Sequence, residues 1–115
     1  MSATTLAPNP ARVRQLNDLF RSTFVGGAVF VTPAIEALDN DSKRRLLADV
    51  RAFDAFNDGN DPHQEHDFGT LELNGQRFMW KIGYMDKATC TRASEDPSDS
   101  TVTTRVLTVC RADED

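Results

Sequence analysis

The stretch FGTLELNGQRFMWKIGY, residues 68–84, decides the fold, because it holds two β-prone runs joined at Asn74-Gly75. Asn-Gly is the favoured dipeptide of a two-residue type I′ hairpin turn. This turn predicts the cross-strand pairs Leu73–Gln76, Glu72–Arg77 and Leu71–Phe78. The same register predicts one apolar face, which we assign to the core, and a slip of one residue would expose it to water. That face comprises Leu71, Leu73, Phe78, Trp80, Ile82 and Tyr84.

The segment before the hairpin contains two helical patterns separated by a short apolar run. The first helix begins with Asn9 as cap and Pro10 as first residue, and Gly26-Gly27 ends it. Residues 28–31 are apolar and predict a buried strand, and residues 33–38 predict a brief helical turn. From Ser42 a second amphipathic helix follows. The first helix carries an apolar stripe of Val13, Leu16, Phe20 and Phe24, and we expect its Arg12, Arg14, Asp18 and Arg21 to face water.

The segment after the hairpin is a polar loop followed by a β-branched run at residues 101–110, which predicts a last strand, with a short helix as the alternative. The complete order of elements predicts an α+β fold: two main helices packed on one face of a largely antiparallel sheet of about four strands. We expect residues 1–8 to be a flexible leader and residues 9–112 to form a single domain.

Composition excludes some classes of protein. The chain has 115 residues with a formal net charge of −5, which disfavours direct nucleic-acid binding. It has no apolar run of the roughly 20 residues that a membrane-spanning helix needs, and no signal-peptide pattern at its start. We therefore expect a cytoplasmic protein. Cys90 and Cys110 lie in no CxxC motif and are expected to be free thiols.

Acidic residues are concentrated between the second helix and the hairpin. Residues 53–76 contain no Lys or Arg but carry Asp54, Asp58, Asp61, Glu65, Asp67 and Glu72. Three interpretations remain open for this segment. Its carboxylates can cap turns in a solvated loop, form a surface that binds a basic partner, or belong to a metal or catalytic site.

The third interpretation depends on His63 and His66, the only histidines in the chain, together with Asp61 and Asp67. Imidazole and carboxylate groups suit zinc, manganese or iron. However, the segment is not HExxH, and no second cluster completes a four-ligand site. We therefore prefer His66 as a structural anchor and His63 as an exposed residue, and we assign no catalytic residue, metal or cofactor.

Three stretches resemble a domain-of-unknown-function family found mainly in alphaproteobacterial genomes and their plasmids. They are LNDLFRSTFVGG at residues 16–27, NDPHQEHDFG at 60–69 followed by WKI at 80–82, and TRVLT at 104–108. The middle stretch is the most specific. The family pattern has an acidic residue after Trp-Lys-Ile, where this chain has Gly83. The resemblance implies no activity, but it implies a small bacterial protein associated with mobile DNA.

These observations favour a non-enzymatic binding protein, of the anti-CRISPR or other anti-defence type, that docks on a basic, nucleic-acid-binding surface of a host protein. The alternatives are a metal-assisted hydrolase using His63, His66 and Asp67, or an antitoxin-like regulatory partner. Oligomeric state stays open. The expected partner-binding residues are Asp54, Asp58, Asp61, His63, Glu65, Asp67, Glu95, Asp96 and Asp99.

Overall fold

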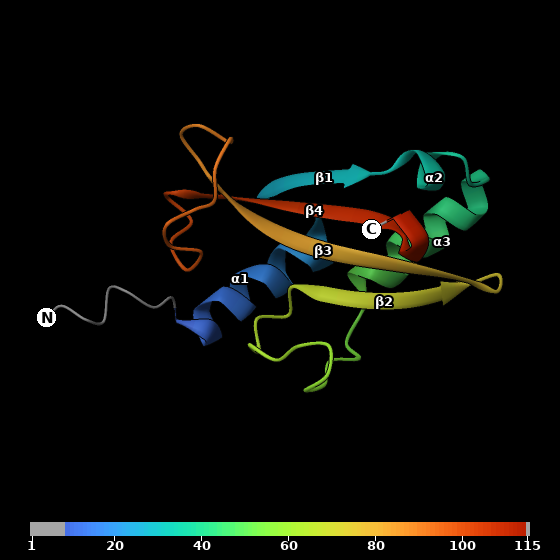
Figure 1. Ribbon diagram of the computed structural model, residues 1–115, viewed down its shortest axis with the longest axis horizontal. Helices are drawn as coiled ribbons and strands as arrows, with labels where there is room; N and C mark the ends of the chain where they lie inside the picture. Colours follow the sequence, from blue (N-terminus) through green and yellow to red (C-terminus); the bar gives the residue numbers. More distant parts are fainter. Residues whose placement is uncertain (1–8, 115) are drawn as a thin grey trace, which may run out of the picture.

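Four strands form one mixed sheet in the order β1-β4-β3-β2 in the computed structural model, which describes residues 9–114 (Figure 1). The strands are β1 (Gly27–Val31), β2 (Phe68–Leu73), β3 (Gln76–Asp86) and β4 (Thr103–Arg111). β2, β3 and β4 pair antiparallel, whereas β1 pairs parallel with β4. The α+β class and the largely antiparallel sheet are thus as predicted. The expected leader at residues 1–8 lies outside the described residues.

The β2–β3 hairpin has the predicted register, with Leu73 opposite Gln76 and Leu71 opposite Phe78. Asn74 and Gly75 have φ values of 55° and 78°, as a type I′ turn requires. The side chains of Phe78, Trp80 and Ile82 are buried. In the last segment, residues 103–111 form a strand, and the helical alternative for this region is wrong.

Helix α1 (Pro10–Thr23) begins at the predicted cap, because the Asn9 side chain accepts hydrogen bonds from two backbone N–H groups of the first turn. It ends earlier than predicted. Phe24 itself takes the left-handed conformation, with φ of 59°, and its N–H donates to the Phe20 carbonyl. The prediction that Gly26-Gly27 ends the helix is therefore wrong, and Gly27 instead opens β1.

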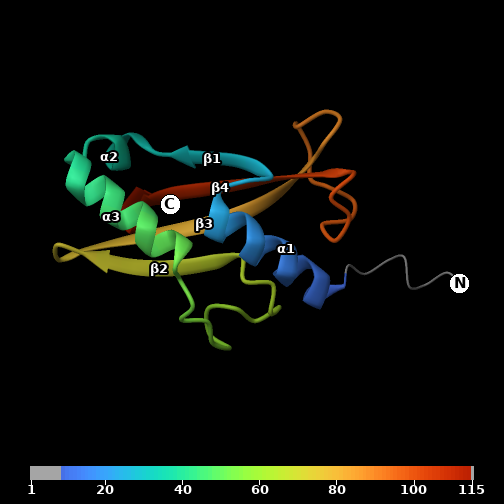
Figure 2. The same ribbon diagram turned by 180° about the vertical axis from the view of Figure 1, so that it is seen from behind.

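Helix α2 (Pro33–Glu36) is a single turn, and α3 (Asn40–Arg51) is capped by Asp39, whose carboxylate accepts from the Ser42 N–H. Helix α3 therefore begins two residues before the predicted start. Figure 2 shows α1 and α3 in front of the strands, and Figure 1 shows them behind. One core cluster joins α1, α2, α3 and all four strands, and its buried members include Phe20, Ile35, Leu46, Val50, Trp80 and Leu107, with Val29 and Val31 packed against them.

Arg21 on α1 was expected to face water, and this expectation is wrong. Its side chain is buried, and Nη2 donates to the Phe53 carbonyl at 3.1 Å. The guanidinium also lies over the rings of Phe56 and Trp80, at 5.3 and 5.2 Å from their centroids. Arg21 is therefore held inside by aromatic faces and a carbonyl that approach it from other parts of the chain.

In the part of the chain that the structure describes, no helix is both long and apolar enough to cross a bilayer. Cys90 is a free, exposed thiol, as predicted, and Cys110 is buried.

Candidate functional site

The loop at residues 52–67, between α3 and β2, is held in a fixed shape by its own side chains. The side-chain Oδ1 of Asn57 accepts hydrogen bonds from the backbone N–H groups of Gly59 and Asn60. Asp61 is only 5% exposed, and its Oδ1 accepts from the N–H groups of Glu65 and His66, each at 3.0 Å. Asp61 is therefore a turn cap inside the loop, and its side chain is buried.

His66 fastens this loop to α1. Its ring stacks on Phe56, with centroids 3.7 Å apart and an interplanar angle of 2°. Nδ1 lies 2.8 Å from Asp18 Oδ1, and Nε2 lies 3.5 Å from Asp61 Oδ2. These contacts agree with His66 as a structural anchor, whereas His63 is exposed. Among the described residues, no group of three His, Cys, Asp or Glu side chains could hold a metal ion.

A buried polar network lies under the same loop, centred on Asn17 of α1. Asn17 is fully buried, and its Nδ2 donates to the Glu65 carbonyl at 2.9 Å and to the Tyr84 hydroxyl at 2.8 Å. The Tyr84 hydroxyl donates in turn to Glu65 Oε1 at 2.8 Å. Burial raises the pKa of Tyr84 above its ordinary value, so its hydroxyl stays protonated. Glu65 is therefore also an internal residue of the loop.

Arg105 extends this network to a second loop, at residues 87–102. Its Nε donates to Asn17 Oδ1 at 2.6 Å, and its Nη2 donates to the Pro97 carbonyl. The guanidinium lies 5.3 Å from the centroid of the Tyr84 ring. Burial lowers the pKa of Arg105. The two loops that the sequence singled out are thus joined through Asn17 and Arg105.

The acidic residues of the second loop have local roles. Asp96 Oδ1 accepts from the N–H and hydroxyl of Ser98, and Asp99 Oδ1 accepts from the N–H and hydroxyl of Thr101. The bonds from Thr101 hold the pKa of Asp99 below its ordinary value. Glu95 is exposed. Of the residues expected to bind a partner, those with exposed side chains are Asp54, Asp58, His63 and Glu95.

Asp67 differs from both groups, because it is half-buried and its carboxylate forms no hydrogen bond with another described residue. Burial raises the pKa of Asp67, and the nearby carboxylates of Glu65 and Asp61 raise it further. The loop thus retains a carboxylate whose charge the fold disfavours. Shifted pKa values of this kind occur both in structural networks and at functional sites.

We expect Asp67→Asn to raise the free energy of unfolding at pH 7. A carboxyl whose pKa is raised in the folded state destabilises that state when charged. This gain in stability should shrink as the pH falls below the folded-state pKa. It should vanish below the ordinary Asp pKa of 3.8, where the carboxyl is protonated in both the folded and the unfolded state. Urea unfolding at several pH values, followed by the fluorescence of the single tryptophan, Trp80, measures the difference. Asp58→Ser removes an exposed charge and is the control; an Asp67→Asn effect that does not vary with pH would contradict this assignment.

Sequence reasoning missed the buried polar network. It predicted no role for the side chains of Asn17 and Arg105, and it assigned Tyr84 to the apolar face without a role for its hydroxyl. A pattern for Asn17 was present, because positions 13, 17, 20 and 24 follow helical spacing as well as the stripe through Leu16 does. Arg105 lies two and four residues before Leu107 and Val109 in β4, so all three side chains point to the same, buried face of the strand. A polar residue at an apolar position was therefore the indication of a buried network.

No curated protein and no solved structure matches the chain. A family model described as "Protein of unknown function (DUF3768)" matches residues 31–114. The match confirms the predicted resemblance to a domain-of-unknown-function family and carries no activity with it. The chain belongs to this family of proteins of unknown function, DUF3768.

Proposed function

We propose that this chain is a cytoplasmic, non-enzymatic binding protein that docks through loop 52–67 on a basic surface of another protein. The supporting observation is a loop of fixed shape whose outward carboxylates, Asp54 and Asp58, form no ion pair within residues 9–114. The partner is a host protein whose basic surface normally binds nucleic acid, such as a CRISPR or other defence complex. The proposed action is inhibition of that partner.

The fixed shape of the loop favours tight docking. Asp61, His66 and the Asn57 turn order the loop before any partner arrives, so binding does not have to supply that ordering. The half-buried Asp67 adds a second source of affinity. A cation brought by the partner would offset the repulsion that Asp67 experiences from Glu65 and Asp61.

The docking surface is smaller than the sequence alone predicts. Asp61 and Glu65 are used internally, and Arg14 of α1 reaches the loop and donates to the Gln64 carbonyl at 3.0 Å. Arg14 also lines a shallow hollow of about 320 Å³ together with Asp58. We therefore centre the surface on Asp54 and Asp58, with Asp67 and His63 beside them and Glu95 as an outlying contact.

We do not carry the hydrolase alternative forward, because both ring nitrogens of His66 face carboxylates and its ring is covered by Phe56. Nothing in the geometry favours His63, His66 and Asp67 as a shared site. An antitoxin-like role would use the same kind of protein–protein docking, and the identity of the captured partner separates it from defence inhibition.

The test combines capture of the partner with association kinetics. The full chain is immobilised, proteins retained from a bacterial lysate are identified by mass spectrometry, and their association rates are measured with the purified partner. We expect the double variant Asp54→Ser/Asp58→Ser to associate about tenfold more slowly at low salt, because exposed charges at an interface act mainly on the association rate. The difference in association rate between the variant and the unmodified chain should shrink at high salt, because salt screens exposed charges.

The matched control is Asp49→Gln/Glu72→Gln, which removes the same amount of charge from exposed positions on α3 and β2. We expect its association rate to stay within about twofold of the unmodified chain. Equal rates for the two double variants would show that overall charge, and not loop 52–67, governs binding. A partner that binds the loop variant normally would contradict the proposal.

A further inference from the structure

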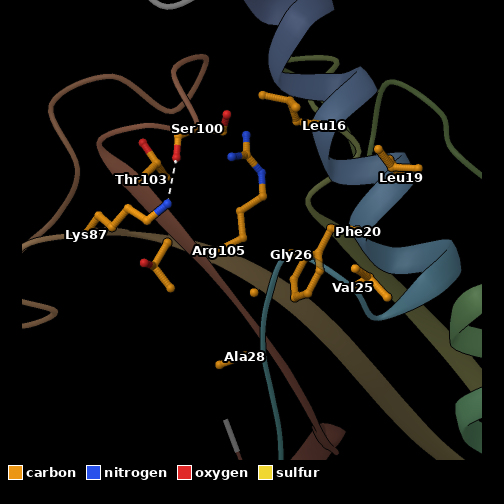
Figure 3. A pocket seen from close by; sticks show the side chains of 12 residues that line it. Leu16, Leu19, Phe20, Val25, Gly26, Ala28, Lys87, Ser100, Thr103 and Arg105 are labelled. Atoms are coloured by element: carbon orange, nitrogen blue, oxygen red, sulfur yellow. Dashed lines mark hydrogen bonds between the residues drawn. The ribbon is translucent and has the colours of Figure 1, made fainter.

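A groove of about 580 Å³ lies where α1 passes the first residues of β1 and β4 (Figure 3). Leu16, Leu19 and Phe20 of α1 line it together with Val25 and the start of β1. Its volume falls within the range of about 300–1,000 Å³ that is typical of small-molecule sites. The groove is separate from the proposed docking loop, and the inference below does not depend on that proposal.

The apolar side of the groove is open to solvent. Leu19 is 61% exposed and Val25 is 71% exposed, and both are among the most exposed large apolar side chains of residues 9–114. Figure 3 shows them on the α1 side, with Leu16 and Phe20 nearby. Single exposed apolar residues are common, but these line one concave surface, which is typical of a binding site.

The opposite side carries two cations and no acid. Lys87 and Arg105 line the groove, while no Asp or Glu does, in a chain with 18 acidic and 13 basic residues. Figure 3 shows Lys87 and Arg105 next to each other beside Ser100. Lys87 Nζ is bonded only weakly, to the Ser100 carbonyl at 3.3 Å. The local charge is therefore opposite to that of the whole chain.

Arg105 is 4% exposed and is not paired with a carboxylate among the described residues. Its hydrogen bonds use Nε and Nη2, to an amide and a peptide carbonyl, and leave Nη1 without a partner among residues 9–114. A buried guanidinium usually has an anionic partner, because removing its charge from water is costly. Arg105 thus offers one strong, unused donor at the groove.

We propose that this groove binds a small carboxylic acid with an apolar body. The carboxylate would accept hydrogen bonds from Arg105 Nη1 and Lys87 Nζ, which supply one donor for each of its two oxygens. The apolar body would lie against Leu16, Leu19 and Val25 and remove their surface from water. Within the fold, the charge of Glu65 attracts Arg105 without forming an ion pair with it, and the ligand's carboxylate would add a directly bonded negative charge.

The test is a titration of the full chain with octanoate, followed by ¹H–¹⁵N correlation spectra, with 1-octanol as the neutral ligand of equal tail length. We expect octanoate to shift the amide signals of residues 25–28 and 103–105 and to bind at least tenfold more tightly than octanol. Equal affinity for octanol would overturn the proposal, and so would shifts centred elsewhere or no binding at millimolar concentration.

Substitutions at two exposed side chains test the charged and the apolar contacts of the ligand separately, and we expect neither to disturb the fold. Lys87→Gln should weaken the binding of octanoate about tenfold and leave the affinity for octanol unchanged, whereas Leu19→Ser should weaken the binding of both ligands. Arg45→Gln removes an equal charge from the exposed face of α3 and should change neither affinity. If Lys87→Gln and Arg45→Gln weaken octanoate equally, the carboxylate is not recognised in this groove and the proposal fails.

Discussion

Replacing Asn17 with Leu is expected to lower the free energy of unfolding by about 4 kcal/mol. Leu has the same number and branching of side-chain heavy atoms as Asn, with a larger volume, but offers no polar atom. Arg105 Nε therefore loses its acceptor and the Glu65 carbonyl loses its donor. The Tyr84 hydroxyl also loses its donor. These groups are buried or partly buried, so water replaces the lost bonds only in part. The largest share of the loss comes from the buried charge of Arg105.

Urea unfolding followed by Trp80 fluorescence measures this loss, because Trp80 is the single tryptophan and is fully buried. Gln15→Leu is the matched control: it makes a similar change on the exposed face of α1 and should alter stability by no more than about 0.5 kcal/mol. Tyr84→Phe removes one hydroxyl of the network, and its loss of stability should lie between those of Gln15→Leu and Asn17→Leu. If Asn17→Leu costs no more than Gln15→Leu, the network contributes nothing measurable to stability.

The hairpin was predictable because its determinants are local. Asn74 and Gly75 specify the turn, and the turn specifies every pair from Leu73–Gln76 outward. The alternation of apolar residues in β3 supports the same register. Helix α1 begins as predicted for a similar reason, since Asn9 and Pro10 act on the adjacent backbone. Sequence reasoning succeeds where one or two neighbouring residues decide the conformation.

The end of α1 and the burial of Arg21 were not predictable from neighbouring residues. Phe24 takes a left-handed conformation and lies 5.5 Å below the guanidinium of Arg51, a contact with α3 that the local sequence does not encode. Arg21 is held by Phe53, Phe56 and Trp80, which lie more than thirty positions away. The parallel pairing of β1 with β4 likewise joins the two ends of the domain.

The candidate site, like the fold, was predictable from the sequence only in part. Composition located the acidic loop correctly, but the roles of its carboxylates depend on where the chain turns. Asp61 caps backbone N–H groups and Glu65 bonds to Tyr84, whereas Asp54 and Asp58 remain outward. The sequence does not distinguish these residues, although Asp61 and Glu65 stabilise the loop whereas Asp54 and Asp58 are exposed. Only their burial and hydrogen bonds separate the two groups.

The second large effect that we expect is at Gly27, the first residue of β1. Gly27→Ala should cost about 3 kcal/mol of stability, because a Cβ atom there would overlap the Arg105 carbonyl oxygen and lie 2.9 Å from the Phe20 ring. The carbonyl belongs to the backbone of β4, so the overlap is relieved only if β1 moves away from its partner strand. This change acts on the pairing of β1 with β4, the feature of the sheet that local sequence did not reveal.

Gly83→Ala is the matched control within the same sheet. A Cβ atom at Gly83 would meet nothing closer than the Val106 carbonyl oxygen at 4.0 Å, which is an ordinary contact. Since Ala also restricts the unfolded chain more than Gly does, we expect Gly83→Ala to be neutral or stabilising by up to about 1 kcal/mol. Urea unfolding gives both values, and hydrogen exchange should show faster opening of residues 28–31 in Gly27→Ala alone. Equal costs for the two variants would mean that a general preference for glycine in these strands, and not the close approach of β1 to β4, accounts for the loss.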